Sequence, residues 1–388
     1  MKGWGMTVFR IVFALVMVNA PTHAQWPQDP EIDRRIQQGI DHIYNLEFEE
    51  AERDLGEVVL LRPDHPAGHF FVAMVQWWRI LSNFTETEED DRFYDLLDKV
   101  VELCDKRLMK DDRDVAALFF KGGAIGFRGR LRANRGKWVG AANDGIIALP
   151  LVRKAYALDP KNADVLLGIG IYNYYAEVIP DRYPIVQPLM MFFPSGDRAK
   201  GLQQLEEASQ RAAYARVEAL YFLMQNMYMF EKDFGRSLEL AQRLSSLYPK
   251  NPLFHRYLGR CLVANGRLGP ANEVFVEIDR RVRAKQRGYD AYDGRESAYY
   301  LGRYELFAGN YDKALQQFYR CDEMSRGLDK EGSSGFMAMA NLQIGMIYDL
   351  QGKRSHAQQQ YRKVLVMKDY ENAHRDATAH LTRPYGKP

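Results

Sequence analysis

The chain is poor in cysteine, and the few that it has follow no reactive or metal-binding pattern. Its 388 residues include three cysteines, Cys104, Cys261 and Cys321, and none belongs to a C-x-x-C motif. Each falls in a helical pattern where a small apolar residue would serve, which is typical of buried thiols. An odd number also leaves at least one thiol without a disulfide. We therefore predict a fold that no disulfide framework holds together, and the sequence leaves the pairing of the three thiols open.

Excess charge is also absent. The chain has 53 Lys and Arg residues against 51 Asp and Glu residues. Residues 1–24 hold two of the basic residues and no acidic one, so 53 minus 2 leaves 51 against 51 in the remainder. A neutral chain does not bind nucleic acid through its overall charge. We expect no nucleic-acid partner.

Catalytic and cofactor-binding motifs are missing as well. The chain has no G-x-S-x-G motif, and its glycine-rich stretch at residues 122–129 lacks the G-K-[ST] ending of a phosphate-binding loop. His65 and His69 are four residues apart, which would suit a metal site on a helix. The prolines around Asp64 instead predict an inter-helix turn in which Asp64 caps the following helix. The sequence predicts no enzyme, no cofactor and no metal.

No apolar run is long enough to span a bilayer, and the one at the N-terminus is typical of a secretory leader. Lys2 and Arg10 precede the apolar residues 11–18, and small residues follow up to Ala24. We expect a signal peptide at residues 1–24, cleaved after Ala24, and an exported protein that is periplasmic or secreted. We expect the remaining residues 25–388 to form one solenoid domain.

What the chain does have is a repeated pattern of helix pairs. In each clear copy an apolar residue and Gly lie in a first helix, Gly lies in the turn, and Ala and an aromatic residue lie in a second helix. The copies are Leu258-Gly259, Gly266, Ala271 and Phe275; Leu301-Gly302, Gly309, Ala314 and Phe318; and Ile344-Gly345, Gly352, Ala357 and Tyr361. The small residues allow the two helices to cross closely, and the pattern is that of the tetratricopeptide repeat, whose period is about 34 residues.

Weaker copies extend this pattern toward the N-terminus, and strand patterns are absent. We therefore predict an all-α protein, a right-handed α-solenoid of about seven to eight tetratricopeptide-like helix pairs. An amphipathic segment at residues 371–381 would cap its open end.

The central part of the chain carries a narrower resemblance. G-I-G-I-Y-N-Y-Y at residues 168–175 and F-P-S-G-D-R-A-K-G-L-Q-Q-L at residues 193–205 resemble the inclusion-body-clearance family of tetratricopeptide proteins, over about residues 165–275. The resemblance implies an adapter-like role near membranes and lipid stores, without catalytic activity. The leader departs from that family, so the resemblance supplies neither location nor partner.

Between these two motifs we expect an apolar, proline-rich insert at about residues 177–195, in place of a short turn. The insert could fold into the solenoid groove, because exposed apolar patches are costly in a soluble protein. It could instead dock on a membrane surface or partner, through Met190, Met191, Phe192 and Phe193. Ser195 and Asp197 are expected to cap the next helix, with Arg198 paired locally.

Two runs of basic residues can each be interpreted in two ways. One contains Arg128, Arg130, Arg132, Arg135 and Lys137, and the other contains Arg280, Arg281, Arg283, Lys285 and Arg287. Each is either a solvated face balanced by nearby acids or a docking patch for an acidic protein, glycan or lipid headgroup.

The concave face is the expected ligand surface of a solenoid. Aligned repeats place a set of first-helix residues there, and the predicted partner-binding residues among them are Asn226, Arg256, Arg260, Tyr299 and Arg303. Arginines on adjacent helices would grip a carboxylate or an acidic peptide, unless they pair with Glu296 or Glu305. We predict an exported, non-catalytic scaffold or adapter that binds a protein or acidic peptide, with the lipid-associated adapter as the alternative. The oligomeric state stays open.

Overall fold

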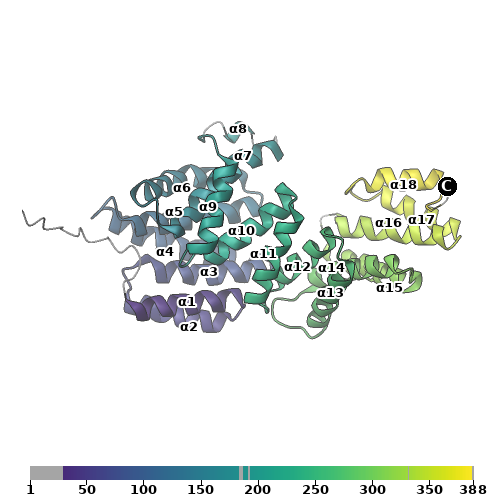
Figure 1. Ribbon diagram of the computed structural model, residues 1–388, viewed down its shortest axis with the longest axis horizontal. Helices are drawn as coiled ribbons and strands as arrows, with labels where there is room; N and C mark the ends of the chain where they lie inside the picture. The colour runs from purple at the N-terminus through teal and green to yellow at the C-terminus, as the bar shows by residue number, and fades with distance from the viewer. Residues whose placement is uncertain (1–28, 183–186, 191–192, 331, 387–388) are drawn as a thin grey trace, which may run out of the picture.

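The computed structural model describes residues 29–182, 187–190, 193–330 and 332–386, and these form helices without a strand (Figure 1). Eight antiparallel pairs follow one another in the described part. They are α1 (Pro30–Tyr44) with α2 (Phe48–Leu61), α3 (Pro66–Ser82) with α4 (Asp90–Leu108), α5 (Val115–Asn134) with α6 (Trp138–Leu158), α7 (Ala163–Arg182) with α9 (Arg198–Arg211), α10 (Arg216–Asn226) with α11 (Phe234–Leu247), α12 (Pro252–Ala264) with α13 (Leu268–Arg283), α14 (Ala291–Phe307) with α15 (Tyr311–Leu328), and α16 (Gly335–Leu350) with α17 (Arg354–Leu365).

Three further elements complete this description. The short helix α8 (Gln187–Met190) lies between α7 and α9, and the π-helical turn η2 (Met227–Glu231) extends α10. Helix α18 (Ala373–Thr382) covers the last pair, where its buried Ala373 and Ala377 join the cluster around Tyr361. The predicted all-α solenoid with a C-terminal capping helix is confirmed.

Glycine sets the close crossing within the repeats, as the spacing predicted. A Cβ on Gly259 would lie 2.6 Å from the ring of Phe275, and one on Gly345 would lie 2.5 Å from the ring of Tyr361. At the inter-helix turn of the first of these pairs, Gly266 has φ of +70°, a conformation that L-residues rarely adopt. The second-helix aromatic ring therefore occupies the space that any first-helix side chain would take.

The start of α3 differs from the expectation. His65, and not Asp64, is its N-cap residue, and the His65 Nδ1 accepts the Ala67 N–H at 3.2 Å. Burial lowers the pKa of His65 to about 4, which keeps the ring neutral and able to accept. His69 contacts the Pro63 carbonyl oxygen, so each of the two histidines has its own backbone partner.

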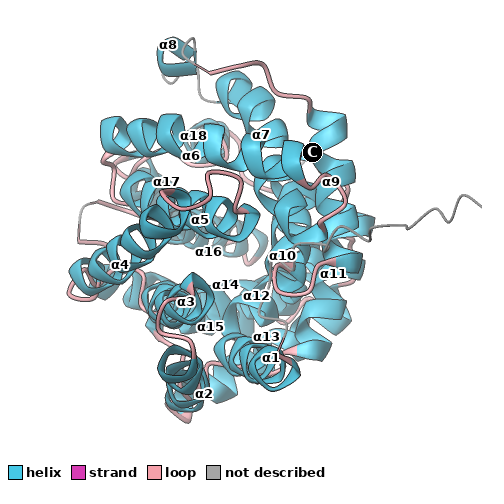
Figure 2. Ribbon diagram, turned by 90° about the vertical axis from the view of Figure 1, so that its left-hand side faces the viewer, coloured by secondary structure: helices cyan, strands magenta, loops and turns pink. Residues whose placement is uncertain are grey.

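The solenoid closes on itself, because α1 packs against repeats more than 170 residues later in the chain (Figure 2). The Tyr44 ring lies 5.0 Å from Trp78, 5.3 Å from Tyr248 and 6.2 Å from Phe254, measured between centroids. One continuous core extends from Ile32 in α1 to residues of α12 and α13. The side chains of α1 and α12 consequently belong to the same core.

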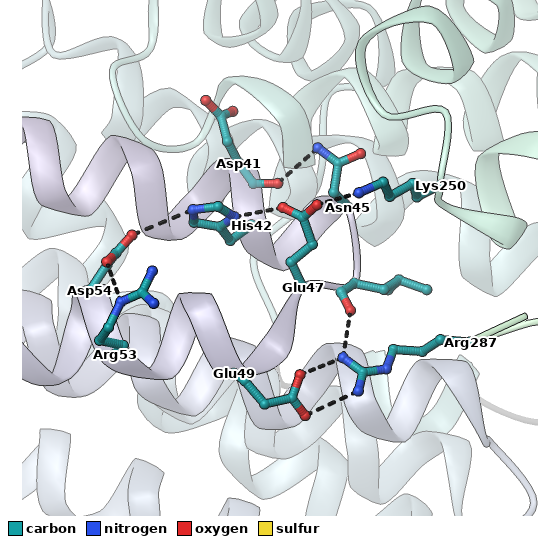
Figure 3. Close-up of polar contacts among 10 residues, drawn as sticks. Asp41, His42, Asn45, Glu47, Glu49, Arg53, Asp54, Lys250 and Arg287 are labelled. Atoms are coloured by element: carbon teal, nitrogen blue, oxygen red, sulfur yellow. Dashed lines mark hydrogen bonds and ion pairs between the residues drawn. The ribbon is translucent and has the colours of Figure 1, made fainter.

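Polar contacts at the rim fasten this closure (Figure 3). Lys250 pairs with Glu47 and Arg287 pairs with Glu49, as the figure shows. Below them the buried Asn251, which the figure does not draw, donates from Nδ2 to the Tyr44 carbonyl oxygen at 2.9 Å. Partners on the surface contribute little to stability. The buried aromatic cluster therefore supplies most of the closing free energy, and the ion pairs set the register.

The central insert is shorter than predicted, because α7 continues through Pro180 to Arg182. A proline in the last turn removes one backbone hydrogen bond.

Beyond the insert, a Cβ on Gly201 would lie 2.5 Å from the Tyr174 amide nitrogen, so α7 and α9 cross in backbone contact. Asp197 caps α9 by accepting the Lys200 N–H at 2.9 Å.

The pairing of Arg198 is a second correction in this region. Its Nε donates to Glu231 Oε1 at 2.9 Å, and the Tyr174 hydroxyl donates to the same oxygen at 2.6 Å. Arg198 therefore ties the start of α9 to η2, 33 residues away, instead of pairing locally. The G-D-R-x-x-G motif is explained by capping and close helix packing.

The predicted docking residues of the insert are only partly covered by the structure. Met191 and Phe192 lie outside the described residues, and Met190 is the last residue of α8. Phe193 is half-buried, and its ring lies against Gly145 of α6. The insert therefore meets the outside of α6 through Phe193.

Candidate functional site

A pocket of about 230 Å³ lies where the closed part of the solenoid meets its C-terminal arm. Its walls are the end of α3 with the following loop, α12 as far as Arg260, the start of α14 as far as Glu296, and Phe336 of α16. The charged, polar and aromatic residues of these walls include Phe84, Thr85, Arg256, Arg260, Asp290, Tyr292, Asp293, Arg295 and Glu296. Closure of the solenoid builds this pocket, since it brings α3 beside α12.

Two ion pairs between α12 and α14 form the charged wall. Arg256 Nη1 lies 3.0 Å from Asp293 Oδ1, and Arg260 donates to both oxygens of Glu296 at 2.5 Å. Asp293 and Glu296 are each only 2% exposed. Arg256 and Arg260 share one face of α12 because they are four residues apart. The sequence left open whether these arginines bind a partner or pair with Glu296 or Glu305. In the structure Arg260 pairs with Glu296.

Asp293 is buried in this wall and has one partner on each carboxylate oxygen. Its Oδ2 accepts the Asp290 N–H at 3.1 Å, within a capping box at the start of α14. Its Oδ1 accepts no hydrogen bond from any described residue, and neither does the buried Nε of Arg256 donate one. Burial is the main cause that raises the pKa of Asp293 to about 6, against the lowering effect of Arg256. Arg256 and Asp293 are therefore held together in the buried wall by an ion pair whose geometry is not that of a hydrogen bond.

Arg295 closes the far side of the pocket. Its Nη1 lies 2.7 Å from Asp329 Oδ1, and its guanidinium lies 5.2 Å from the Tyr292 ring and 5.3 Å from the Phe336 ring. Such cation–π contacts stabilise a buried guanidinium. Arg295 thereby joins α14 to α16, and its Nε has no hydrogen-bond partner among the described residues.

The other predicted partner-binding residues lie elsewhere. Asn226 is fully buried and accepts the Tyr175 hydroxyl at 2.7 Å, and Tyr299 is buried against Phe318 and Phe336. Arg303 is exposed, with its guanidinium 5.9 Å from the Tyr300 ring. Of the five residues, the structure brings only Arg256 and Arg260 together at a pocket, because curvature turns the other positions into the core or away from it.

Several pocket residues escaped the sequence analysis. Asp290 and Asp293 had a usable signal, since two acids three residues apart before an apolar pattern indicate a helix start. The sequence carries no signal that would place Phe84, Thr85 and Tyr292 at a pocket. Only the closure of the solenoid brings the loop after α3 opposite α14.

In the first basic run Arg128, Arg130 and Arg132 lie in α5, Arg135 and Lys137 lie in the turn that follows it, and the four arginines are paired. Their partners are Asp98 and Asp144 for Arg128, Glu218 for Arg130, Asp144 for Arg132, and Asp90 for Arg135. Arg135 also donates to the carbonyl oxygens of Phe84 and Glu86, so it fixes the loop at the pocket rim.

The second basic run ends α13 and continues into the loop before α14. Arg280 and Arg281 pair with Glu277, Arg283 pairs with Asp279, and Arg287 pairs with Glu49. Both runs therefore have the acidic partners expected of balanced helix faces.

Other kinds of site find no support in the described part of the chain. No three His, Cys, Asp or Glu side chains there are placed to hold a metal ion, and no described helix is long and apolar enough to cross a membrane. Cys104, Cys261 and Cys321 are buried free thiols, and burial raises their pKa values to about 12, 11 and 12. Such thiols are poor nucleophiles near neutral pH.

The fold is tetratricopeptide-like. Among solved structures the chain is similar to Pseudomonas aeruginosa PilF (15% identity, TM-score 0.42, 67% of this chain and 97% of that one). It is also similar to human IFIT1 in a dimer with m7Gppp-AAAA, with 14% identity and a TM-score of 0.43 over 92% of this chain and 86% of that one. A third similar structure is a Rap protein complexed with Competence and Sporulation Factor, with 12% identity and a TM-score of 0.44 over 92% of this chain and 96% of that one. No protein-family model and no curated protein matches the chain. The narrower resemblance to the inclusion-body-clearance family stays a prediction.

Proposed function

We propose that the protein is an exported, non-catalytic scaffold that binds a segment of a partner protein in the pocket between α3, α12 and α14. The observation that carries this proposal is the open pocket of about 230 Å³ itself, which is lined by exposed Phe84 and Thr85 of the loop after α3 and by residues of α12 and α14. Concave pockets that combine apolar rings with a few polar groups are typical binding sites. Export rests on the leader at residues 1–24.

A blocked pocket is expected to lose this partner. Thr85 is exposed and lines the pocket, whereas Thr87 is exposed on the same loop and does not line it. Thr85→Trp should reduce partner capture at least about tenfold, because an indole at the rim excludes a segment from the pocket, and Thr87→Trp should leave capture unchanged. The measurement is photo-crosslinking in the native envelope from a crosslinker placed at Leu253, with the crosslinked peptides identified by mass spectrometry.

The same experiment also tests export, because the mature chain recovered from the envelope should begin at Gln25. Equal capture by the Thr85 and Thr87 variants would contradict binding in the pocket. Recovery of the chain only from the cytoplasm, with residues 1–24 retained, would contradict export.

A lipid-associated adapter remains the second candidate, and one observation favours it. The outer side of α6 exposes Trp138, Val139, Ile146 and Ile147, with Val139 80% exposed, and Phe193 of the insert packs beside them on Gly145. Contiguous exposed apolar side chains mark interaction surfaces. Trp at the end of an apolar helix face is typical of contact with a membrane interface.

This candidate predicts flotation with lipid vesicles. Val139→Asp combined with Ile146→Asp should reduce flotation on phosphatidylglycerol vesicles to the level of protein alone, because two charges would enter the apolar layer. Val366→Asp, at a residue that is 85% exposed on the C-terminal arm, is the matched control. Flotation that is absent in the unmodified protein, or unchanged in the double variant, would exclude this surface.

A further inference from the structure

The charged side chains that line the pocket balance one another. Three are basic and three are acidic: Arg256, Arg260, Arg295, Asp290, Asp293 and Glu296. In the wall between α12 and α14, Arg256 lies against Asp293 and Arg260 against Glu296. A charged ligand would disturb this balance, because it would add a charge of one sign without its counterpart. A polar ligand group without net charge would leave the balance intact.

The arginines of this wall nevertheless have further donors. An arginine side chain has five N–H donors, and Glu296 accepts only from Nε and Nη2 of Arg260. Arg260 Nη1 and Arg256 Nη2 donate no hydrogen bond to any described residue. The arginines are also the accessible members of the two pairs, since their side chains are 21% and 28% exposed against 2% and 3% for the acids. The wall therefore offers N–H groups to a ligand.

An acceptor lies in the same wall. Asp290 is the N-cap residue of α14, lines the pocket and is half-buried. Its Oδ1 accepts the Asp293 N–H at 3.1 Å, whereas its Oδ2 accepts no hydrogen bond from any described residue. Asp290 and Asp293 form one capping box, and Asp293 contacts Arg256, so the acceptor lies close to the arginine donors. A ligand group that both accepts and donates hydrogen bonds matches this arrangement.

A carboxylate of the ligand is a poorer match than an amide. Asp293 already places a carboxyl group against Arg256, and burial raises the pKa of that carboxyl to about 6 in spite of the contact. The buried wall therefore disfavours a second negative charge beside the arginine. The oxygen of a carboxamide accepts from the same N–H groups without carrying a charge, and its nitrogen donates. Asn and Gln are the side chains with this group.

We propose that the pocket binds the side-chain carboxamide of a Gln or Asn residue in the partner segment. Its oxygen accepts from Arg256 and Arg260, and its nitrogen donates to Asp290. The exposed ring of Phe84 and the half-buried ring of Tyr292, which also line the pocket, suit the methylene groups of that side chain. This inference rests on the proposed function and names the chemistry of its ligand. It differs from the acidic peptide expected from the sequence, because the structure places an acid against each of the two arginines on α12.

The test uses the mature protein and four blocked peptides, acetyl-Gly-X-Gly-amide with Gln, Glu, Lys or Ala at X. Their affinities are measured by ligand-observed NMR at about pH 7.5. We expect the Gln peptide to bind at least about fivefold more tightly than the other three, which is the usual net contribution of a hydrogen bond. Its affinity should change by less than about twofold between low and high salt, because screening acts on charged groups.

Asp290→Ser tests the acceptor. Serine keeps a capping oxygen at the start of α14 but removes Oδ2, so this variant should lose most of the preference for the Gln peptide over the Ala peptide. Asp233→Ser is the matched control, because Asp233 caps α11 through its side chain and does not line the pocket. It should keep the preference. If Asp290→Ser does not fold, the ranking of the four peptides by the unmodified protein decides.

Three results would overturn the inference: equal or tighter binding of the Glu or Lys peptide, equal binding of the Gln and Ala peptides, or an unchanged preference in Asp290→Ser. The absence of binding by any of the peptides to a millimolar protein sample would also overturn it. A partner crosslinked through a segment without Gln or Asn would refute this inference and leave the proposed function standing. Failure of both the crosslinking and the peptides would refute the two together.

Discussion

Arg260→Leu is expected to lower the free energy of unfolding by about 3–5 kcal/mol, the usual effect of removing one partner from a buried ion pair. Glu296 is 2% exposed, and Arg260 binds both of its carboxylate oxygens at 2.5 Å. Without the guanidinium, a carboxylate would remain in the wall between α12 and α14. The measurement is the urea-unfolding midpoint followed by circular dichroism.

The double variant Arg260→Leu with Glu296→Leu is the decisive control. Replacing both partners of a buried pair by apolar residues is often neutral or stabilising, so we expect the double variant to recover most of the lost stability. If Arg260→Leu and the double variant were equally destabilised, the loss would come from packing and not from an unpaired charge.

Tyr44→Ala should have an effect of similar size, about 3–5 kcal/mol, because the ring joins α1 to the later repeats. The side chain contacts Trp78, Tyr248 and Phe254, and its hydroxyl donates to Glu218 at 3.0 Å. Its truncation leaves a cavity in the core where the solenoid closes. Hydrogen exchange should show earlier opening of α1 and α2 than in the unmodified protein, while α14 to α17 keep their protection.

Tyr44→Phe separates the ring from its hydroxyl. It removes only the bond to Glu218, whose other carboxylate oxygen still pairs with Arg130 at 3.1 Å. The expected loss is about 1 kcal/mol, with unchanged exchange in α1. Equal losses for the Ala and Phe variants would mean that the buried hydrogen bond, and not the aromatic cluster, closes the solenoid.

These two residues are linked through the pocket. Tyr44 holds Trp78 of α3 against Phe254 of α12, and Arg260 holds α12 to α14. The pocket lies among these three helices, so its shape depends on a contact between the first repeat and the sixth. A partner segment bound there would be expected to stabilise the closed form, since a ligand shifts the equilibrium toward the state that it binds.

The repeats themselves were predictable because the forces that specify them are local. Gly259 and Phe275, or Gly345 and Tyr361, lie within one helix pair, so a fixed spacing along the chain reports directly on their contact. The capping role of Asp197 was predictable for the same reason. The pairing of Arg198 was not, since Glu231 reaches it from another repeat.

The sequence by itself therefore determined the all-helical architecture, the crossing of each helix pair and the arginines on one face of α12. The tertiary structure decided what those arginines meet: Asp293 and Glu296 across the interface, and the loop after α3 across the pocket. The physical reason is curvature. Small rotations between successive repeats add up until α1 meets α12, and this sum depends on every packed interface, so no short spacing in the chain encodes it.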